Sequence, residues 1–197
     1  MFEHHIRETV AADEELTSAG LLRSVQRPLV PVDSVRSDEF MTPSTLAKRI
    51  VAVLQPSGVI LEPCPGTGNF VRALRPYGTV LVCRGDFYAW QRPCDWIITN
   101  PPYSQFKDFL AHALTLATHV ALLAPINHSW TKLRVRLVRD AGFGYRQLWL
   151  VETSSEFPSS GFQFGVMVLT RGHRGSLMIR HLDSSSGATF QTRPRRR

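Results

Sequence analysis

Short apolar runs alternate with segments of helical periodicity between residues 42 and 170, and this alternation restricts the fold more than any other feature of the sequence. The runs are rich in branched side chains and bounded by turn residues, as buried strands are. The first helical segment opens with Thr42-Pro43, the pattern of an N-cap followed by proline. Alternating strands and helices predict an α/β fold with a mostly parallel central sheet and helices on both faces. The expected strands are 59–62, 79–83, 96–99, 119–124, 145–151 and 164–170, and the expected helices are 42–54, 70–74, 106–118 and 130–140.

The chain of 197 residues has the length of one domain with tails. We expect a flexible N-terminal extension over 1–36, one folded domain over 37–182 and a basic, disordered tail over 183–197. Residues 1–40 carry four basic and eight acidic side chains, whereas residues 41–197 carry 19 basic and eight acidic ones, a net charge of +11. A basic body favours a nucleic-acid partner, because neutralising phosphates releases counterions.

Several classes of protein do not fit the sequence. No run of about 18 apolar residues predicts a membrane span, and the first residues lack the basic-then-apolar order of a secretion signal. Cys64, Cys83 and Cys94 lack the spacing of a zinc site. We therefore expect a cytoplasmic protein with reduced thiols, no membrane association and no metal.

The tetrapeptide Asn100-Pro101-Pro102-Tyr103 directly follows one of the expected strands. The Asn100 side-chain oxygen and the carbonyl of Pro101 can both accept hydrogen bonds from one planar amino group. The prolines stiffen the loop, because each ring fixes φ. The ring of Tyr103 offers a flat face for a base or an amide to stack on. The loop therefore suits a reaction at an amino or amide nitrogen.

A second strand-end motif runs from Glu62 to Gly68 and reads E-x-x-x-G-x-G. Glycines let the backbone turn sharply and pass close to a ligand. The G-x-G-x-x-G dinucleotide fingerprint is an alternative, but Val71 stands where its third glycine would be. The carboxylate before the loop suits an ammonium group better than a pyrophosphate.

Three motifs, Phe40-Met41-Thr42-Pro43, the glycine loop and Asn100–Tyr103, resemble motifs X, I and IV of the gamma-type adenine-N6 DNA methyltransferases, in the same order. The resemblance covers roughly residues 40–170. It implies a Rossmann-like methyltransferase fold with a terminal antiparallel strand, S-adenosylmethionine as the cofactor, and methyl transfer to N6 of adenine in DNA. Residues 37–182 would then form the catalytic domain.

The resemblance also assigns roles to single residues. Asn100, Pro101, Pro102 and Tyr103 would be catalytic. The cofactor-binding set would be Thr42, Pro43, Glu62, Cys64, Gly66, Gly68, Asn69, Asp86 and Phe87, with Cys64 as a small packing side chain rather than a reactive thiol. The acid that this family uses for the cofactor ribose has no counterpart here. Either Asp86 takes that role, or backbone and water do, or cofactor binding is weakened.

Residues on later loops and helices are candidates for substrate binding. Phe157 and Phe162 flank a Ser/Pro-rich loop and could clamp a flipped base, although each also fits the edge of a core. Asn127 and His128 follow the strand 119–124, and His128 also fits a solvated loop. Lys132 and Arg136 share one face of a helix, which could contact phosphates or could be an ordinary solvated face.

Other acceptors remain open at the level of sequence. Glutamine methyltransferases of release factors share Asn-Pro-Pro-Tyr, and RNA methyltransferases use close variants. The missing ribose acid leaves open a nucleic-acid-binding protein without turnover. No segment is long enough for a separate target-recognition domain, so either sequence specificity is relaxed, or the N-terminal extension, the tail or a partner supplies it. The sequence identifies neither the target sequence nor the oligomeric state.

Overall fold

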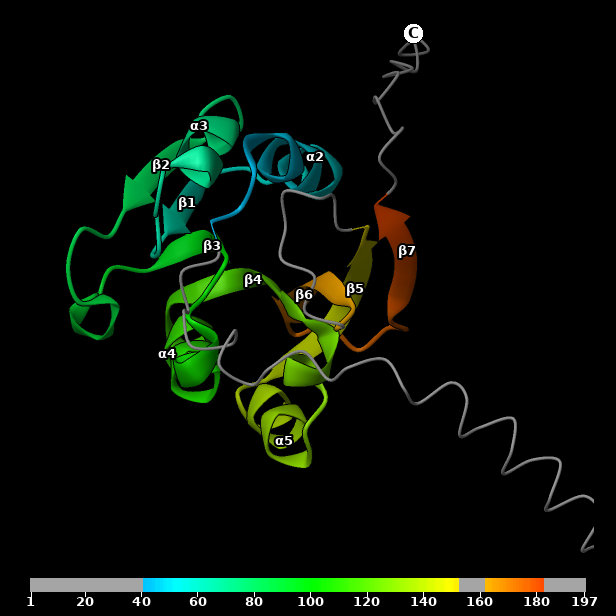
Figure 1. The fold of residues 1–197 in the computed structure, drawn as a ribbon. Coiled ribbons are helices and arrows are strands. Elements are labelled where there is room, and N and C mark those ends of the chain that lie inside the picture. The colour runs from blue at the N-terminus through cyan, green and yellow to red at the C-terminus, as the bar shows by residue number, and fades with distance from the viewer. Residues whose placement is uncertain (1–40, 153–161, 183–197) are drawn as a thin grey trace, which may run out of the picture. The chain divides into compact units, whose positions relative to one another are not determined.

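The computed structural model describes residues 41–152 and 162–182, which form a seven-stranded sheet flanked by helices (Figure 1). The expected N-terminal extension, the basic tail and Phe157 lie outside the described residues. The strands are β1 (Val59–Glu62), β2 (Thr79–Val82), β3 (Cys94–Thr99), β4 (Ala117–Pro125), β5 (Phe143–Val151), β6 (Phe164–Arg171) and β7 (Met178–Leu182). The α-helices are α2 (Ser44–Leu54), α3 (Asn69–Leu74), α4 (Phe106–Leu116) and α5 (Lys132–Asp140), and the 3-10 turns are η2 (Phe87–Ala89), η3 (Tyr103–Gln105) and η4 (Ile126–Ser129).

The strands lie in the order β2-β1-β3-β4-β6-β5-β7. The pairs β1–β2, β1–β3, β3–β4 and β5–β7 are parallel, whereas β6 runs antiparallel to both of its neighbours, β4 and β5. This arrangement confirms the expected Rossmann-like methyltransferase fold. The antiparallel strand near the end of the chain is β6, and the edge strand β7 follows it.

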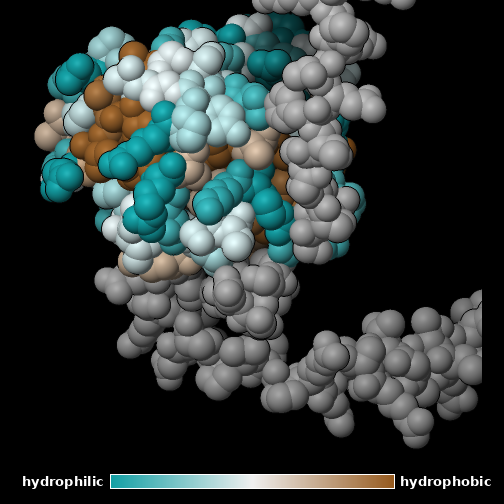
Figure 2. Space-filling view, turned by 90° about the horizontal axis from the view of Figure 1, so that it is seen from above, coloured by the Kyte–Doolittle hydropathy of each residue, from teal (hydrophilic) through white to brown (hydrophobic). Residues whose placement is uncertain are grey.

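Two apolar layers hold helices against the sheet, one on each face. Buried residues of α2 and α3 pack with one set of strand side chains, including Ile60 and Ile98. Those of α4, joined by Val138 of α5, pack with the alternate set, including Leu61 and Ile97. Successive side chains of a strand point to opposite faces, so adjacent residues of β1 and β3 serve different layers. Seen from above, the described surface is mostly hydrophilic, with hydrophobic residues gathered at one side (Figure 2).

Tertiary contacts move several element boundaries from the expected positions. The helix expected over 106–118 ends at Leu116, because Ala117 pairs with Cys94 in the sheet and becomes the first residue of β4. The expected N-cap at Thr42 was wrong by one residue. Pro43 occupies that position with an extended ψ of 146° and the helix begins at Ser44. Thr42 therefore does not cap the helix.

The strand β7 was not expected from the sequence. Four of its five residues are exposed, so it lacks the alternation that marks a half-buried strand. It forms because its backbone pairs with β5 from Gln147 to Val151. The strand β2 forms the opposite edge of the sheet, with Val80, Leu81 and Val82 half-buried.

Candidate functional site

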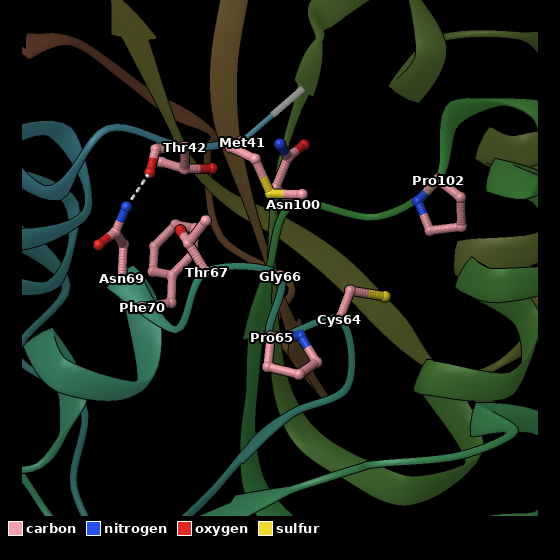
Figure 3. Close-up of a pocket in the computed structure, with 10 residues that line it drawn as sticks. All are labelled: Met41, Thr42, Cys64, Pro65, Gly66, Thr67, Asn69, Phe70, Asn100 and Pro102. Carbon is pink, nitrogen blue, oxygen red and sulfur yellow. Dashed lines mark hydrogen bonds between the residues drawn. The ribbon is translucent and has the colours of Figure 1, made fainter. Parts of the chain in front are cut away.

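A cavity of about 360 Å³ lies beyond the C-terminal ends of β1 and β3 (Figure 3). Three separate segments form its wall: the residues before α2, the loop between β1 and α3 together with the first residues of α3, and the loop after β3. Its volume lies in the range of small-molecule sites. The residues that line the cavity are Met41, Thr42, Cys64, Pro65, Gly66, Thr67, Asn69, Phe70, Asn100 and Pro102.

Two glycines give the β1–α3 loop its conformation. Gly66 and Gly68 have φ of 45° and 77°, which side chains rarely adopt, and Gly68 is the N-cap of α3. A Cβ on Gly66 would come within 2.7 Å of the Met41 sulfur. Figure 3 shows Met41 above this loop, beside Asn100. Gly66 is thus required both by its backbone angle and by the close approach of Met41.

Hydrogen bonds tie the segment before α2 to the loop. The Asn69 side-chain amide donates to the carbonyl of Thr42 at 2.8 Å (Figure 3). Arg72 in turn donates to the Asn69 side-chain oxygen and to the carbonyl of Thr67. The Thr42 hydroxyl is buried and has no hydrogen-bond partner among the described residues. A buried unpartnered hydroxyl on a cavity wall is suited to a polar ligand.

Glu62 lies beneath the loop and not on the cavity wall. Its side chain is fully buried, and Oε1 accepts a hydrogen bond from the Cys64 amide at 2.9 Å. Burial raises the pKa of Glu62 to about 7, against the opposing effect of the Thr99 hydroxyl on β3. Oε2 and the Thr99 hydroxyl are both buried, and neither makes a hydrogen bond of normal geometry within the described structure, so the effect of Thr99 is that of a nearby dipole. Burial and then the proximity of Glu62 raise the pKa of Cys64 to about 12, so its thiol stays protonated.

Asn100 reaches the same cavity from the end of β3. The Tyr103 hydroxyl donates to Asn100 Oδ1 at 2.6 Å, a contact that sequence reasoning did not foresee. The Tyr103 ring lies edge-on to His128 and tilted toward Phe164, with centroid separations of 5.7 and 6.1 Å. Tyr103 therefore bridges the catalytic candidate Asn100 and the ends of β4 and β6.

The structure places Asp86 and Phe87 away from the cavity wall. Asp86 is exposed and accepts a hydrogen bond from the Tyr88 amide at 2.9 Å, which caps η2. Phe87 is buried, with its ring centroid 4.5 Å from that of Phe109. Their shown roles are a local cap and a core contact, and their expected contact with a cofactor adenine stays a prediction.

The substrate-binding candidates lie around η4 and α5 and before β6. Asn127 is exposed, whereas His128 is half-buried between aromatic rings and not a freely solvated side chain. Lys132 and Arg136 are exposed on α5. Phe162 is 54% exposed and lies two residues before the Phe164–Pro125 pair, where β6 meets the C-terminal end of β4.

Sequence reasoning missed four residues of the cavity wall: Met41, Pro65, Thr67 and Phe70. All four lie within or next to the recognised motifs, so their proximity in sequence to a motif was the only indication that they line the cavity. Of the expected set, Thr42, Cys64, Gly66, Asn69, Asn100 and Pro102 line the cavity, whereas Pro43, Glu62, Gly68, Asp86, Phe87, Pro101 and Tyr103 do not.

Comparison with solved structures places this geometry in a known fold. A protein from Listeria monocytogenes assigned to the class I S-adenosylmethionine-dependent methyltransferases superposes with a TM-score of 0.57 at 12% identity, over 76% of this chain and 68% of that one. The M protein of the type I restriction enzyme EcoKI superposes with a TM-score of 0.56 at 14% identity, over 71% and 45%. This chain has the class I methyltransferase fold.

A Vibrio vulnificus protein assigned as the modification subunit of a type I restriction enzyme shares this methyltransferase fold, with a TM-score of 0.55 at 13% identity over 86% of this chain and 51% of that one. The match with each type I subunit spans about half of that subunit's length. No protein-family model matches the sequence, and a search of curated proteins finds no match.

Across residues 41–152 and 162–182, no helix has the length and apolar character needed to cross a membrane. The same ranges hold no cluster of three or more His, Cys, Asp or Glu side chains that could bind a metal ion.

Proposed function

We propose that this protein transfers a methyl group from S-adenosylmethionine to the exocyclic N6 of adenine in DNA. One observation carries the proposal: the glycine loop and Asn100 line the same cavity at one edge of the sheet. Reaction between a donor held by the loop and a nitrogen held by Asn100 requires this proximity, because a productive geometry needs the reacting atoms about 3–3.5 Å apart. Glu62 and Thr99 end neighbouring parallel strands, which supports the same arrangement.

The residues of the cavity fit the cofactor. The Gly66 cradle, which a Cβ would fill, lets a ligand approach the backbone. The unpartnered Thr42 hydroxyl gives the cavity wall a polar group, and the hydrogen bond from the Asn69 side chain to the Thr42 carbonyl fixes the position of that wall. Glu62 Oε2 lies unpartnered beneath the loop, and an ammonium group near it would favour the ionised carboxylate. When bound, S-adenosylmethionine supplies an electrophilic methyl group on its sulfonium.

Asn100 and Pro101 would orient and polarise the acceptor nitrogen. Adenine N6 is a weak nucleophile, because its lone pair is delocalised into the ring. The Asn100 side-chain oxygen and the carbonyl of Pro101 would accept hydrogen bonds from its two N–H groups and favour a pyramidal nitrogen. These fixed dipoles would stabilise the charge that develops on the nitrogen. Asn100 Oδ1 has two lone pairs, so it can accept a hydrogen bond from the amino group while it also accepts the one from the Tyr103 hydroxyl. No strong base is needed, because the amine loses its proton after it becomes cationic.

Charge and exposed aromatic surface support a nucleic-acid substrate. Residues 41–197 carry a net charge of +11, and Lys132 and Arg136 are exposed on α5 to contact phosphates. Phe162, which is exposed just before β6, would stack on an extruded base, and Phe157 is a second candidate. Similarity to type I restriction-modification N6-adenine methylases favours DNA over other acceptors. Target recognition would come from a partner or from the terminal segments.

A separate observation supports each of two alternative functions. Asn-Pro-Pro-Tyr also suits RNA bases and a protein glutamine amide, because an amide nitrogen poses the same chemical problem. A nucleic-acid-binding protein without turnover is favoured by the absence of Asp86 from the cavity wall and of a second acid after β2.

A methyl-transfer assay separates these functions. Tritiated S-adenosylmethionine is incubated with duplex DNA, RNA or a release factor, and the label in each acceptor is counted. We expect label in DNA, at N6 of adenine, and none with Asn100→Ala, which should still bind the cofactor in calorimetry. Label only in RNA or protein would reassign the substrate. Cofactor binding with no transfer to any acceptor would reject N6 methylation, and absence of cofactor binding would favour the alternative binder.

A further inference from the structure

Arg134 differs from the other basic residues of α5. Lys132, Arg136 and Arg139 are exposed, whereas Arg134 is half-buried and contacts η4 and the start of α4. Its Nη1 donates to the carbonyl of His128 at 2.8 Å. Its guanidinium carbon lies 5.0 Å from the centroid of the Phe106 ring, a cation–π distance. Arg134 is thus positioned to hold η4 and the start of α4 together.

The contacts continue from this arginine to the catalytic candidate. The His128 ring packs edge-on against Phe106 and Tyr103, at centroid separations of 5.5 and 5.7 Å. The Tyr103 hydroxyl donates to Asn100 Oδ1 at 2.6 Å. Each contact is between groups in van der Waals or hydrogen-bond range, so a displaced His128 removes the support on one side of Tyr103.

We propose that Arg134 and His128 are positioning residues that hold Tyr103, and through it set the orientation of the Asn100 amide. This inference deepens the proposed function and rests on it for its catalytic consequence. It also gives α5 a second role besides the proposed phosphate contact: the helix supports the loop that carries Asn100. Burial and then the charge of Arg134 lower the pKa of His128, so the ring stays neutral and packs as an aromatic edge.

The kinetic test compares R134Q with R139Q. Arg139 is the matched control, because it lies on the same helix, is exposed and pairs with Asp140. We expect R134Q to lower kcat by about tenfold to a hundredfold, the cost of a small misplacement, with little change in KM for DNA. R139Q should change neither. A raised KM with unchanged kcat and a shallower salt dependence would identify Arg134 as a phosphate contact and overturn the proposal.

A double-mutant cycle tests the route through Tyr103. If Arg134 acts by supporting Tyr103, adding R134Q to Y103F should lower kcat little further, because residues in one chain of contacts are not additive. Multiplicative losses would contradict the coupling. If R134Q does not fold, R134K replaces it, because lysine keeps the charge but lacks the planar guanidinium. The same pattern of kcat losses is then expected, with smaller values.

A spectroscopic readout requires no turnover and so distinguishes failure of this inference from failure of the proposed function. The Asn100 side-chain amide resonances, assigned from N100D, should shift in both Y103F and R134Q and stay in place in R139Q. The pKa of His128, followed by its imidazole resonances, should rise in R134Q because a nearby positive charge is removed. Unchanged Asn100 resonances in R134Q would reject the coupling whatever the enzyme methylates.

Discussion

The sulfur of Met41 lies so close to Gly66 that a single added methyl group on that glycine would meet it at 2.7 Å. Met41 precedes α2 and Gly66 follows β1, so this contact joins two segments that both line the cavity. The side chain of Met41 is nonetheless 49% exposed, because it covers the loop from the solvent side.

Gly66→Ala should weaken cofactor binding by at least about tenfold, or about 1.4 kcal/mol. The alanine must adopt a φ near 45°, which costs roughly 1–2 kcal/mol, and must also displace Met41. Calorimetric titration with S-adenosylmethionine measures the loss. Gly85→Ala is the control, because its Cβ meets nothing within 4 Å and its backbone is not left-handed. Equal affinities for the two variants would refute this account of the loop.

Glu62→Gln should remove one pH-dependent part of the stability. The folded-state pKa of Glu62 is about 7 against an ordinary 4.5, so between these values the folded protein keeps a proton that the unfolded chain releases. Stability from this group is therefore complete below pH 4.5 and falls by roughly 3 kcal/mol as pH rises to 7. Urea unfolding at pH 5 and pH 7.5 should show a smaller loss in E62Q than in wild type. A loss of the same size in both would contradict the prediction.

Phe87→Ala should destabilise the fold by about 3–5 kcal/mol, as deletion of a buried ring does. Phe87 is 6% exposed and packs on Phe109, so its burial does not depend on a ligand. Phe87→Leu should keep most of the stability, so it separates the core contact from the expected contact with the cofactor. Denaturant unfolding and calorimetry together decide the role: a loss of cofactor affinity in the leucine variant with intact stability would support the contact with the cofactor adenine, and unchanged affinity would reject it.

Lys132→Gln with Arg136→Gln should lower the salt dependence of DNA binding. Each lost phosphate contact reduces the slope of log K against log salt by about 0.9. Fluorescence anisotropy with duplex DNA at several salt concentrations measures this slope. Arg139→Gln should leave it unchanged, because that side chain is exposed but pairs with Asp140. A slope unaffected by the double substitution would remove α5 from the DNA interface.

The positions of the two motifs at strand ends could be predicted from the sequence. Glu62 and Asn100 each follow a short apolar run, and such runs indicate buried strands whatever surrounds them. The contacts of Phe87 could not be predicted in this way. The pair Asp86-Phe87 also fits a cofactor contact by pattern, and only the packing of α4 against the sheet shows that Phe87 is a core residue.

The sequence by itself determined six of the seven described strands, the four described α-helices, the tight glycine loop and the strand-end position of Asn100, because backbone propensities and side-chain periodicity act over a few residues. The tertiary structure alone decided that Met41 covers Gly66, that Tyr103 donates to Asn100, that Arg134 turns inward while Arg136 faces solvent, and that β7 pairs with β5. These contacts join residues by packing between elements, and similar local patterns are compatible with many such packings.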